Sequence, residues 1–219
     1  MKITFISIFP EYFEGFKDHS IIKRAIASKK IIIEVINPRD FADKGIVDDT
    51  VYGGGPGMLL LIEPLVKALE ATKTKDSKVF LLGPRGTIHN QENAKALINF
   101  KHIIFICGHY EGVDARIKYY IDGEISIGEF IITGGEQAAM LVADSLIRLI
   151  PDVIKKESHE NESFENNLIE CDHFSKPANF AGHEVPEVLL SGNHQEINKW
   201  RKQNAIDNTI ELIQKKKGK

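Results

Sequence analysis

Short apolar runs alternate with stretches of helical periodicity through the first 150 residues of the chain. These runs are rich in Ile, Val and Phe and are bounded by turn residues, so they predict strands. A run such as IIFIC does not alternate with polar residues, which is typical of parallel strands covered on both faces. The pattern therefore predicts an α/β fold with a mostly parallel sheet covered by helices. The expected strands are 3–9, 30–36, 78–83, 102–108 and 124–133, and the expected helices are 11–28, 63–73, 90–100, 114–120 and 134–150.

The pattern changes after Pro151. Residues 155–172 are rich in acids and have no core-forming periodicity, which indicates a linker or mobile loop. Further on, a helix is predicted to continue through Trp200, with Asn193 as its N-cap, because an Asn side chain accepts a bond from a backbone N–H of the first turn. We therefore predict three parts: a main α/β domain at 1–154, a mobile linker at 155–177 and a short C-terminal helical domain at 178–219.

Composition adds few constraints. A chain of 219 residues with 42% hydrophobic content is long enough for one sizeable core and a small appendage. No apolar run reaches the roughly 20 residues of a membrane span, and the N-terminus does not resemble a signal peptide, so we expect a cytoplasmic protein with no membrane partner. Cys107 and Cys171 indicate neither a disulfide framework nor a metal site. With a net charge of −3, any nucleic-acid binding has to rest on local patches.

Glycines cluster in YGGGPGM (52–58), LLGPRG (81–86), CGHYEG (107–112) and SIGEFIITGG (126–135). Glycine is costly beside a strand, so it tends to stand where the chain turns sharply or another body approaches closely. Ligands bind beyond the carboxyl ends of parallel strands, so we expect these loops to line one pocket. No phosphate-binding G-x₄-G-K or G-x-G-x-x-G string occurs. The remaining backbone groups and aliphatic walls suit an adenine edge and its faces.

Four strings together closely resemble the bacterial tRNA (guanine-N1)-methyltransferase family: VDDTVYGGGPGM, CGHYEGVDAR, SIGEFIITGGE and SGNHQEINKW. The resemblance runs in matching order from SIFPEYF to NKWR. It implies a SPOUT-type fold with a deep trefoil knot, an exception to the usual absence of threading. It also implies transfer of a methyl group from S-adenosylmethionine to N1 of the guanine 3′-adjacent to the tRNA anticodon, at position 37, which supports reading-frame maintenance.

In this family three knot loops hold the bent methyl donor, largely by backbone contacts. Carried over by the resemblance, the donor-binding residues are Leu81, Leu82, Gly83, Pro84, Gly108, Tyr110, Glu111, Ser126, Ile127, Gly128, Phe130, Ile132, Gly134 and Gly135. The substrate-binding residues implied in the same way are Asp49, Tyr52, Gly54, Asn193, His194 and Arg201.

The resemblance also implies the catalytic residues. Methylation of guanine N1 requires removal of its proton, for which a nearby carboxylate is suited. The string LIECDHFSKP aligns Glu170 with the family's base, and Lys155 matches a position that is often basic and is thought to contact the guanine. Asp172 stands where the family usually has proline, so the base is either Glu170 or Asp172. His109 replaces an arginine and Ala138 replaces a proline of the family pattern.

The implied partners are the tRNA anticodon stem-loop and a second copy of the chain, in a homodimer whose active site is shared between subunits. Candidate phosphate contacts are Lys23, Arg24, Arg39, Lys199, Arg201, Lys202 and the tail from Lys215 to Lys219. No metal ligands are assigned, although the family is described as using Mg²⁺. Two alternatives stay open: a SPOUT methyltransferase of another RNA target, and an RNA-binding module that has lost catalysis.

Overall fold

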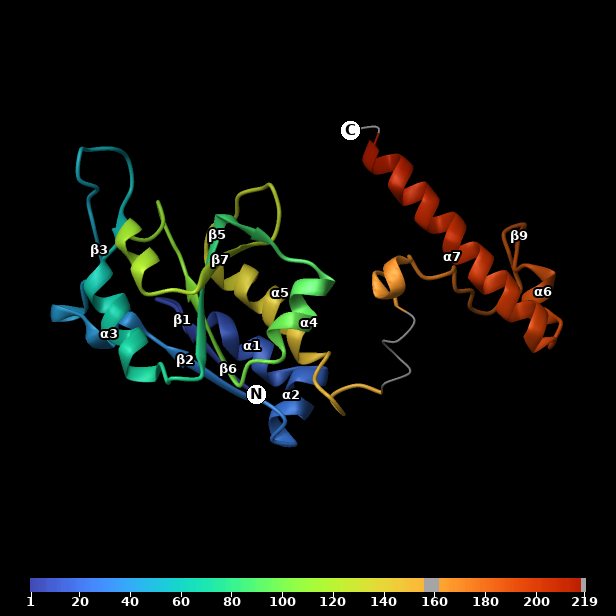
Figure 1. Cartoon of the computed structure of the whole chain (residues 1–219), viewed down its shortest axis with the longest axis horizontal. Coiled ribbons are helices and arrows are strands. Elements are labelled where there is room, and N and C mark those ends of the chain that lie inside the picture. The colour runs from blue at the N-terminus through green and yellow to red at the C-terminus, as the bar shows by residue number, and fades with distance from the viewer. Residues whose placement is uncertain (156–161, 218–219) are drawn as a thin grey trace. The chain divides into compact units, whose positions relative to one another are not determined.

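The computed structural model of the chain describes residues 1–155 and 162–217. The chain divides into two compact units, Met1–Ile154 and Lys155–Lys219, whose elements are labelled in Figure 1. The predicted linker at 155–177 falls partly on 156–161, which lie outside the described residues. The finer division into linker and C-terminal domain therefore stays a prediction.

Unit 1 is built on a parallel sheet of five strands in the order β2-β1-β6-β5-β7. Every neighbouring pair in this sheet runs parallel, which confirms the predicted α/β class. The bounds of the strands are Lys2–Ile6 (β1), Ile32–Ile36 (β2), Ser77–Ile88 (β5), His102–Cys107 (β6) and Gly123–Ser126 (β7).

Helices cover both faces of the sheet. Their bounds are Tyr12–Asp18 (α1), Ser20–Ala27 (α2), Ile62–Thr72 (α3), Gln91–Leu97 (α4) and Gly135–Ile147 (α5), with short 3₁₀ turns at Pro38–Phe41 (η1), Asp43–Gly45 (η2) and Ala115–Tyr119 (η3). The single helix predicted at 11–28 is wrong, because the backbone is extended at His19 and α1 ends there. The His19 ring hydrogen-bonds to the Gly15 carbonyl over 2.7 Å and so takes up a free carbonyl of α1.

The central strand β6 is buried on both faces, which explains why apolar and polar residues do not alternate in its sequence. Ile103, Phe105 and Cys107 pack into one core cluster with side chains of α1, α2, α4 and α5. Ile104 and Ile106 pack into a second cluster on the other face, with side chains of α3. All five side chains are buried, so apolar residues are required at both alternating sets of positions.

The strand predicted at 124–133 is wrong beyond Ser126, where β7 ends. Gly128 has a φ of +144°, a conformation that breaks the strand and that side chains other than glycine rarely adopt. The apolar residues that follow form a loop up to the start of α5. They resemble a strand in sequence because they are β-branched and apolar, but they line a cavity instead of continuing the sheet.

A small antiparallel pair extends from unit 1, formed by Asp48–Asp49 (β3) and Leu59–Leu60 (β4). We call residues 48–60 the β-arm. It contains YGGGPGM, in which the glycines at 53, 54, 55 and 57 all have positive φ. The β-arm is therefore a turn structure that depends on glycine.

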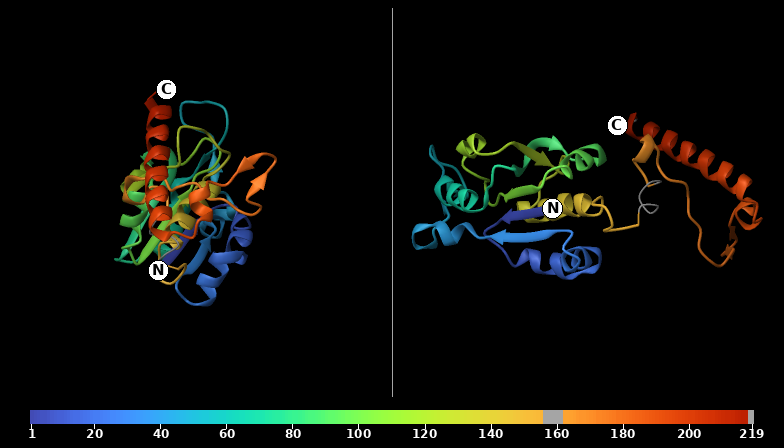
Figure 2. Two further views of the ribbon diagram at one scale, coloured as in Figure 1. Left: turned by 90° about the vertical axis from the view of Figure 1, so that its right-hand side faces the viewer. Right: turned by 60° about the horizontal axis from the view of Figure 1, so that its bottom comes forward.

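Unit 2 contains Glu165–Asn167 (η5), the hairpin Asn179–Phe180 (β8) and His183–Glu184 (β9), and the helices Glu187–Leu190 (α6) and His194–Lys217 (α7). Figures 1 and 2 show α7 as a single long helix, with α6 beside its first turns. The Asn193 side chain accepts bonds from the backbone N–H groups of Gln195 (3.2 Å) and Glu196 (3.4 Å). The predicted N-cap is thus confirmed. Among the described helices of both units, none is long and apolar enough to cross a bilayer.

Candidate functional site

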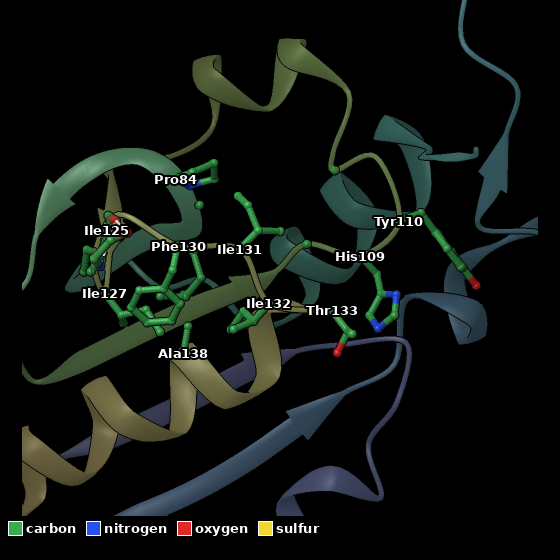
Figure 3. Close-up of a pocket in the computed structure, with 18 of the residues that line it drawn as sticks. Pro84, His109, Tyr110, Ile125, Ile127, Phe130, Ile131, Ile132, Thr133 and Ala138 are labelled. Carbon is green, nitrogen blue, oxygen red and sulfur yellow. Dashed lines mark hydrogen bonds between the residues drawn. The ribbon is translucent and has the colours of Figure 1, made fainter. Parts of the chain in front are cut away.

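A cavity of about 320 Å³ lies in unit 1 where β6 and β7 end. Its walls come from residues 82–84 at the register shift within β5, from the end of β7, from the loops that follow β6 and β7, and from the first turn of α5. Figure 3 shows Ile127, Phe130 and Ile132, from the loop after β7, gathered near Ala138 of α5. The structure thus brings together loops that are far apart in sequence, as expected for parallel strands that end at one edge.

All of the predicted donor-binding residues line this cavity except Leu81. Leu81 instead packs against the second core cluster, beneath the sheet end. The cavity also includes residues that were not assigned to donor binding: His109, Gly112, Ile125, Ile131 and Thr133. It includes Ala138 as well, at the position where the resemblance implied a proline lining the donor site. Each lies inside, or within a few residues of, one of the glycine-rich strings, so proximity to those strings is the signal that finds them.

Glycine at positions 135 and 86 allows main chain to contact main chain, and Gly135 lines the cavity. A Cβ added at Gly135 would lie 2.8 Å from Cys107 Cα and 2.9 Å from the Gly108 nitrogen, and the Gly135 N–H donates to the Gly108 carbonyl over 2.8 Å. A Cβ at Gly86, in β5, would overlap the main-chain carbonyl of Glu124 in the neighbouring strand β7. Main chain therefore packs directly against main chain at both glycines, which explains why neither position carries a side chain.

A buried carboxylate lies under the cavity floor. Glu136, in the first turn of α5, is 1% exposed and accepts a hydrogen bond from Ser7 Oγ at 2.7 Å. Complete burial, with a smaller contribution from the Glu136 charge, raises the pKa of the Cys107 thiol well above its usual value. Cys107 therefore stays protonated and is unsuited to act as a nucleophile.

Unit 2 carries the predicted catalytic residues. Lys155 is exposed at its start. The Glu170 carboxylate is 45% exposed and lies 3.8 Å from the His173 ring. Asp172 instead accepts hydrogen bonds from two Asn side chains of α7. The two candidate bases therefore have different surroundings.

Comparisons with known proteins agree with this geometry. The sequence model of the family described as "tRNA (Guanine-1)-methyltransferase TrmD" matches residues 1–215. A tRNA (guanine-N(1)-)-methyltransferase of Malacoplasma penetrans is 54% identical over 211 residues, which cover 95% of this chain and 93% of that protein. The protein with the same name from Mycoplasmopsis pulmonis is 54% identical over 212 residues, with the same coverage. The chain belongs to this family. The tRNA (guanine-N(1)-)-methyltransferase of Mycoplasma mycoides subsp. mycoides is 51% identical over 213 residues, which cover 96% of this chain and 89% of that protein.

The residues expected to bind tRNA in this methyltransferase family lie outside the cavity. Asp49, Tyr52 and Gly54 belong to the β-arm, where Tyr52 is fully exposed. Asn193 and His194 begin α7, and Arg201 is exposed on it. These residues are thus divided between the two units, and their role stays a prediction.

The cations expected to contact phosphate are partly paired within the protein. Lys23 lies 2.8 Å from Asp18, and Arg39 donates to the Gly45 carbonyl. Lys199 pairs with Glu196 and Lys215 with Glu211, while Arg24, Arg201 and Lys202 are exposed and Lys219 lies outside the described residues. Within residues 1–155 and 162–217, no three His, Cys, Asp or Glu side chains group as metal ligands would.

Proposed function

We propose that the cavity of unit 1 binds S-adenosylmethionine and that Glu170 removes the proton from the guanine nitrogen that receives the methyl group. By family the chain is a tRNA (guanine-N1)-methyltransferase, whose target is the guanine at tRNA position 37. The observation that carries the proposal is the convergence of three glycine-containing segments, at the register shift of β5 and after β6 and β7, on one cavity. S-adenosylmethionine supplies the electrophilic methyl group.

The residues of the cavity fit this donor in size and chemistry. A volume of about 320 Å³ is typical of small-molecule sites, which are mostly apolar with a few placed polar groups. Ile127 and Ile132 supply apolar walls for an adenine ring, and the main chain at Gly108 and Gly134 supplies donors and acceptors for its edge. None of the described lining residues is Lys or Arg, in keeping with a ligand that carries no phosphate.

Methyl transfer to N1 needs a proton acceptor on the chain. Glu170 takes the N1 proton, the electron pair left on N1 forms the bond to the methyl carbon, and the pair of the carbon–sulfur bond returns to sulfur. Lys155 donates a hydrogen bond to guanine O6, where negative charge develops as the proton leaves. A carboxylate placed within reach typically contributes a factor of about 10² to 10⁴ in rate.

The target base has to leave the anticodon stack before it can be methylated. We assign contacts with the anticodon stem-loop to the β-arm and to the start of α7, through Asp49, Tyr52, Gly54, Asn193, His194 and Arg201. The full exposure of Tyr52 supports this assignment, because an exposed aromatic ring can stack on an unpaired base.

We also propose a homodimer in which each active site combines the cavity of one subunit with unit 2 of its partner. Support comes from Phe130 and Ile131 at the cavity, which are 57% and 82% exposed, since adjacent exposed apolar side chains mark surfaces that are covered in an assembly. The trefoil knot, the linker at 155–177 and the C-terminal domain at 178–219 belong to the same proposal. The close main-chain contact at Gly135, between the end of β6 and the start of α5, supports the knot.

Transfer of labelled methyl from S-adenosylmethionine tests the function. Two tRNA transcripts are compared, with guanine or adenine 3′ of the anticodon, using the wild type and Glu170→Gln. We expect incorporation only into the guanine transcript and a loss of about 100-fold or more in the variant. Full activity in Glu170→Gln would move the base elsewhere. Donor binding without incorporation would favour an RNA-binding module.

A further inference from the structure

Glu170 and Asp172 are two residues apart in unit 2, and side chains of α7 hydrogen-bond to the Asp172 carboxylate. Asp172 Oδ2 accepts a bond from Asn204 Nδ2 at 3.3 Å, and Asp172 Oδ1 accepts one from Asn208 Nδ2 at 3.2 Å. The Asp172 N–H in turn donates to Asn204 Oδ1 at 2.7 Å. Asp172 is therefore fastened to α7 through its main chain and through both oxygens of its side chain.

Backbone groups fix the orientation of both amide side chains. Asn204 Oδ1 faces the N–H of Asp172, which can only donate. Asn208 Nδ2 faces the carbonyl of Glu170 at 3.0 Å, which can only accept. The opposite placement of oxygen and nitrogen would lose these bonds, so each amide presents its NH₂ group to the Asp172 carboxylate.

A third side chain of α7 extends this attachment. Thr209 Oγ1 accepts a bond from the Ile169 N–H at 2.9 Å and donates to the Ala205 carbonyl at 2.7 Å. Asn204 and Asn208 are four positions apart and so share one face of the helix, and Thr209 follows Asn208 directly and bonds to the same segment at Ile169. We call the three side chains Asn204, Asn208 and Thr209 the α7 clamp.

Glu170 is held in a different way. Its N–H donates to Ser163 Oγ at 3.2 Å and its carbonyl accepts from Asn208, so its main chain is fixed at both ends. Its carboxylate is 45% exposed, with His173 Nε2 3.8 Å away. Among the described hydrogen bonds of the α7 clamp, none goes to this carboxylate. Glu170 thus combines a fixed main chain with a side chain that can reach a substrate.

We infer that Asn204 and Asn208 are positioning residues for Glu170, and that Asp172 is the anchor they hold and not the base. The inference rests on the proposed function, in which Glu170 takes the N1 proton. For the Asp172 carboxylate to reach the guanine, its bonds to Asn204 and Asn208 would have to break, whereas the Glu170 carboxylate makes no bond to the α7 clamp. Accurate placement matters because an error of about 1 Å in the position of a reacting group can lower the rate about 100-fold.

Single-turnover methyl transfer to the guanine transcript tests the inference, together with the tRNA dissociation constant. We expect a loss of about 100-fold or more for Glu170→Gln. For Asn208→Ala we expect a loss of about 10- to 100-fold with tRNA affinity within about twofold of the wild type. Asp172→Asn keeps the main-chain bond to Asn204 but only one of the two side-chain bonds, because its NH₂ group faces an NH₂ group of α7, so it should lose about 10-fold, well below the loss in Glu170→Gln. Gln203→Ala is the matched control and should match the wild type, because the Gln203 side chain donates along the helix to Asp207 and, among the described residues, makes no bond to the segment that holds Glu170.

A double variant separates positioning from folding. In the Glu170→Gln background, Asn208→Ala should cost less than about threefold more, because the group that it positions is gone. If the double variant loses activity by the product of the two single losses, the inference is overturned. A loss in Asp172→Asn as large as that in Glu170→Gln also overturns it. If Asn208→Ala loses tRNA binding, Asn204→Ala is judged by the same criteria.

The same data distinguish the two levels of the argument. If the wild type fails to methylate the guanine transcript, the proposed function is wrong. If Glu170→Gln is inactive while Asn208→Ala matches Gln203→Ala, only the positioning role is wrong.

Discussion

Replacement of Gly135 by alanine should weaken donor binding because the new methyl group has no space. Its Cβ would lie 2.8 Å from Cys107 Cα and 2.9 Å from the Gly108 nitrogen. Carbon atoms in contact prefer a separation of about 3.5 Å or more, so the two backbones have to part by about 0.7 Å. Neither neighbour is a flexible side chain, and the displaced backbone is the end of β6, which carries the cavity loop 108–112.

Overpacking of this kind costs about 1–3 kcal/mol. If the strain is relieved by moving the cavity loop, the affinity for S-adenosylmethionine falls by about 5- to 100-fold. If the loop stays in place, the same free energy is lost from the stability of unit 1. Calorimetric titration with S-adenosylmethionine measures the first quantity, and urea-induced unfolding measures the second.

Gly15→Ala is the matched control. No atom lies within 4 Å of a Cβ at Gly15, which is inside α1, so alanine there should raise stability by about 0.5–1 kcal/mol and leave donor affinity unchanged. The two substitutions are chemically identical and should have opposite effects on stability. Wild-type affinity together with wild-type stability in Gly135→Ala would refute the packing argument.

Two further outcomes concern buried polar groups. Ser7→Ala removes a hydrogen bond from the buried Glu136 carboxylate and should lower the free energy of unfolding by about 1–3 kcal/mol in urea; an unchanged midpoint would contradict this. Burial, and then the charge of Lys2, lowers the pKa of His102, so the folded state binds fewer protons than the unfolded chain. The stability contributed by neutral His102 should be complete above the unfolded pKa of about 6.5 and be lost as the pH falls towards the lower folded pKa. Urea unfolding between pH 7.5 and 5 should show a smaller pH dependence in His102→Gln than in the wild type, and equal slopes would contradict it.

The parallel sheet was predictable because burial on both faces leaves a direct trace in the sequence. The run at 103–107 is apolar throughout, and β6 is buried at each position. The run at 124–133 has a similar composition, yet β7 ends at Ser126. Apolar side chains that line a cavity cannot be told from those that fill a core by composition alone. The positive φ of Gly128 decides between them, and it is visible only in the structure.

The cavity was predictable through its glycines and the family resemblance, because neighbouring strand ends bring short strings together. Leu81 and Leu82 were both predicted to bind the donor, but side chains alternate between the two faces of a strand, so Leu82 lines the cavity while Leu81 packs against the second core cluster. The α7 clamp left no comparable trace. Asn208 contacts Glu170 and Asp172 across 38 and 36 residues, and an Asn on an exposed helix usually has no such role.

The contact at Gly135 also limits how this site can change under selection. A competitor of the proposed methyl donor would meet main chain at this glycine, which substitution alters little. Escape by adding a side chain is closed at Gly135, because the first carbon would already collide with backbone. Resistance would have to arise in the apolar walls, at Ile127, Phe130 or Ile132, where a change that repels an inhibitor also alters the enclosure of the natural ligand.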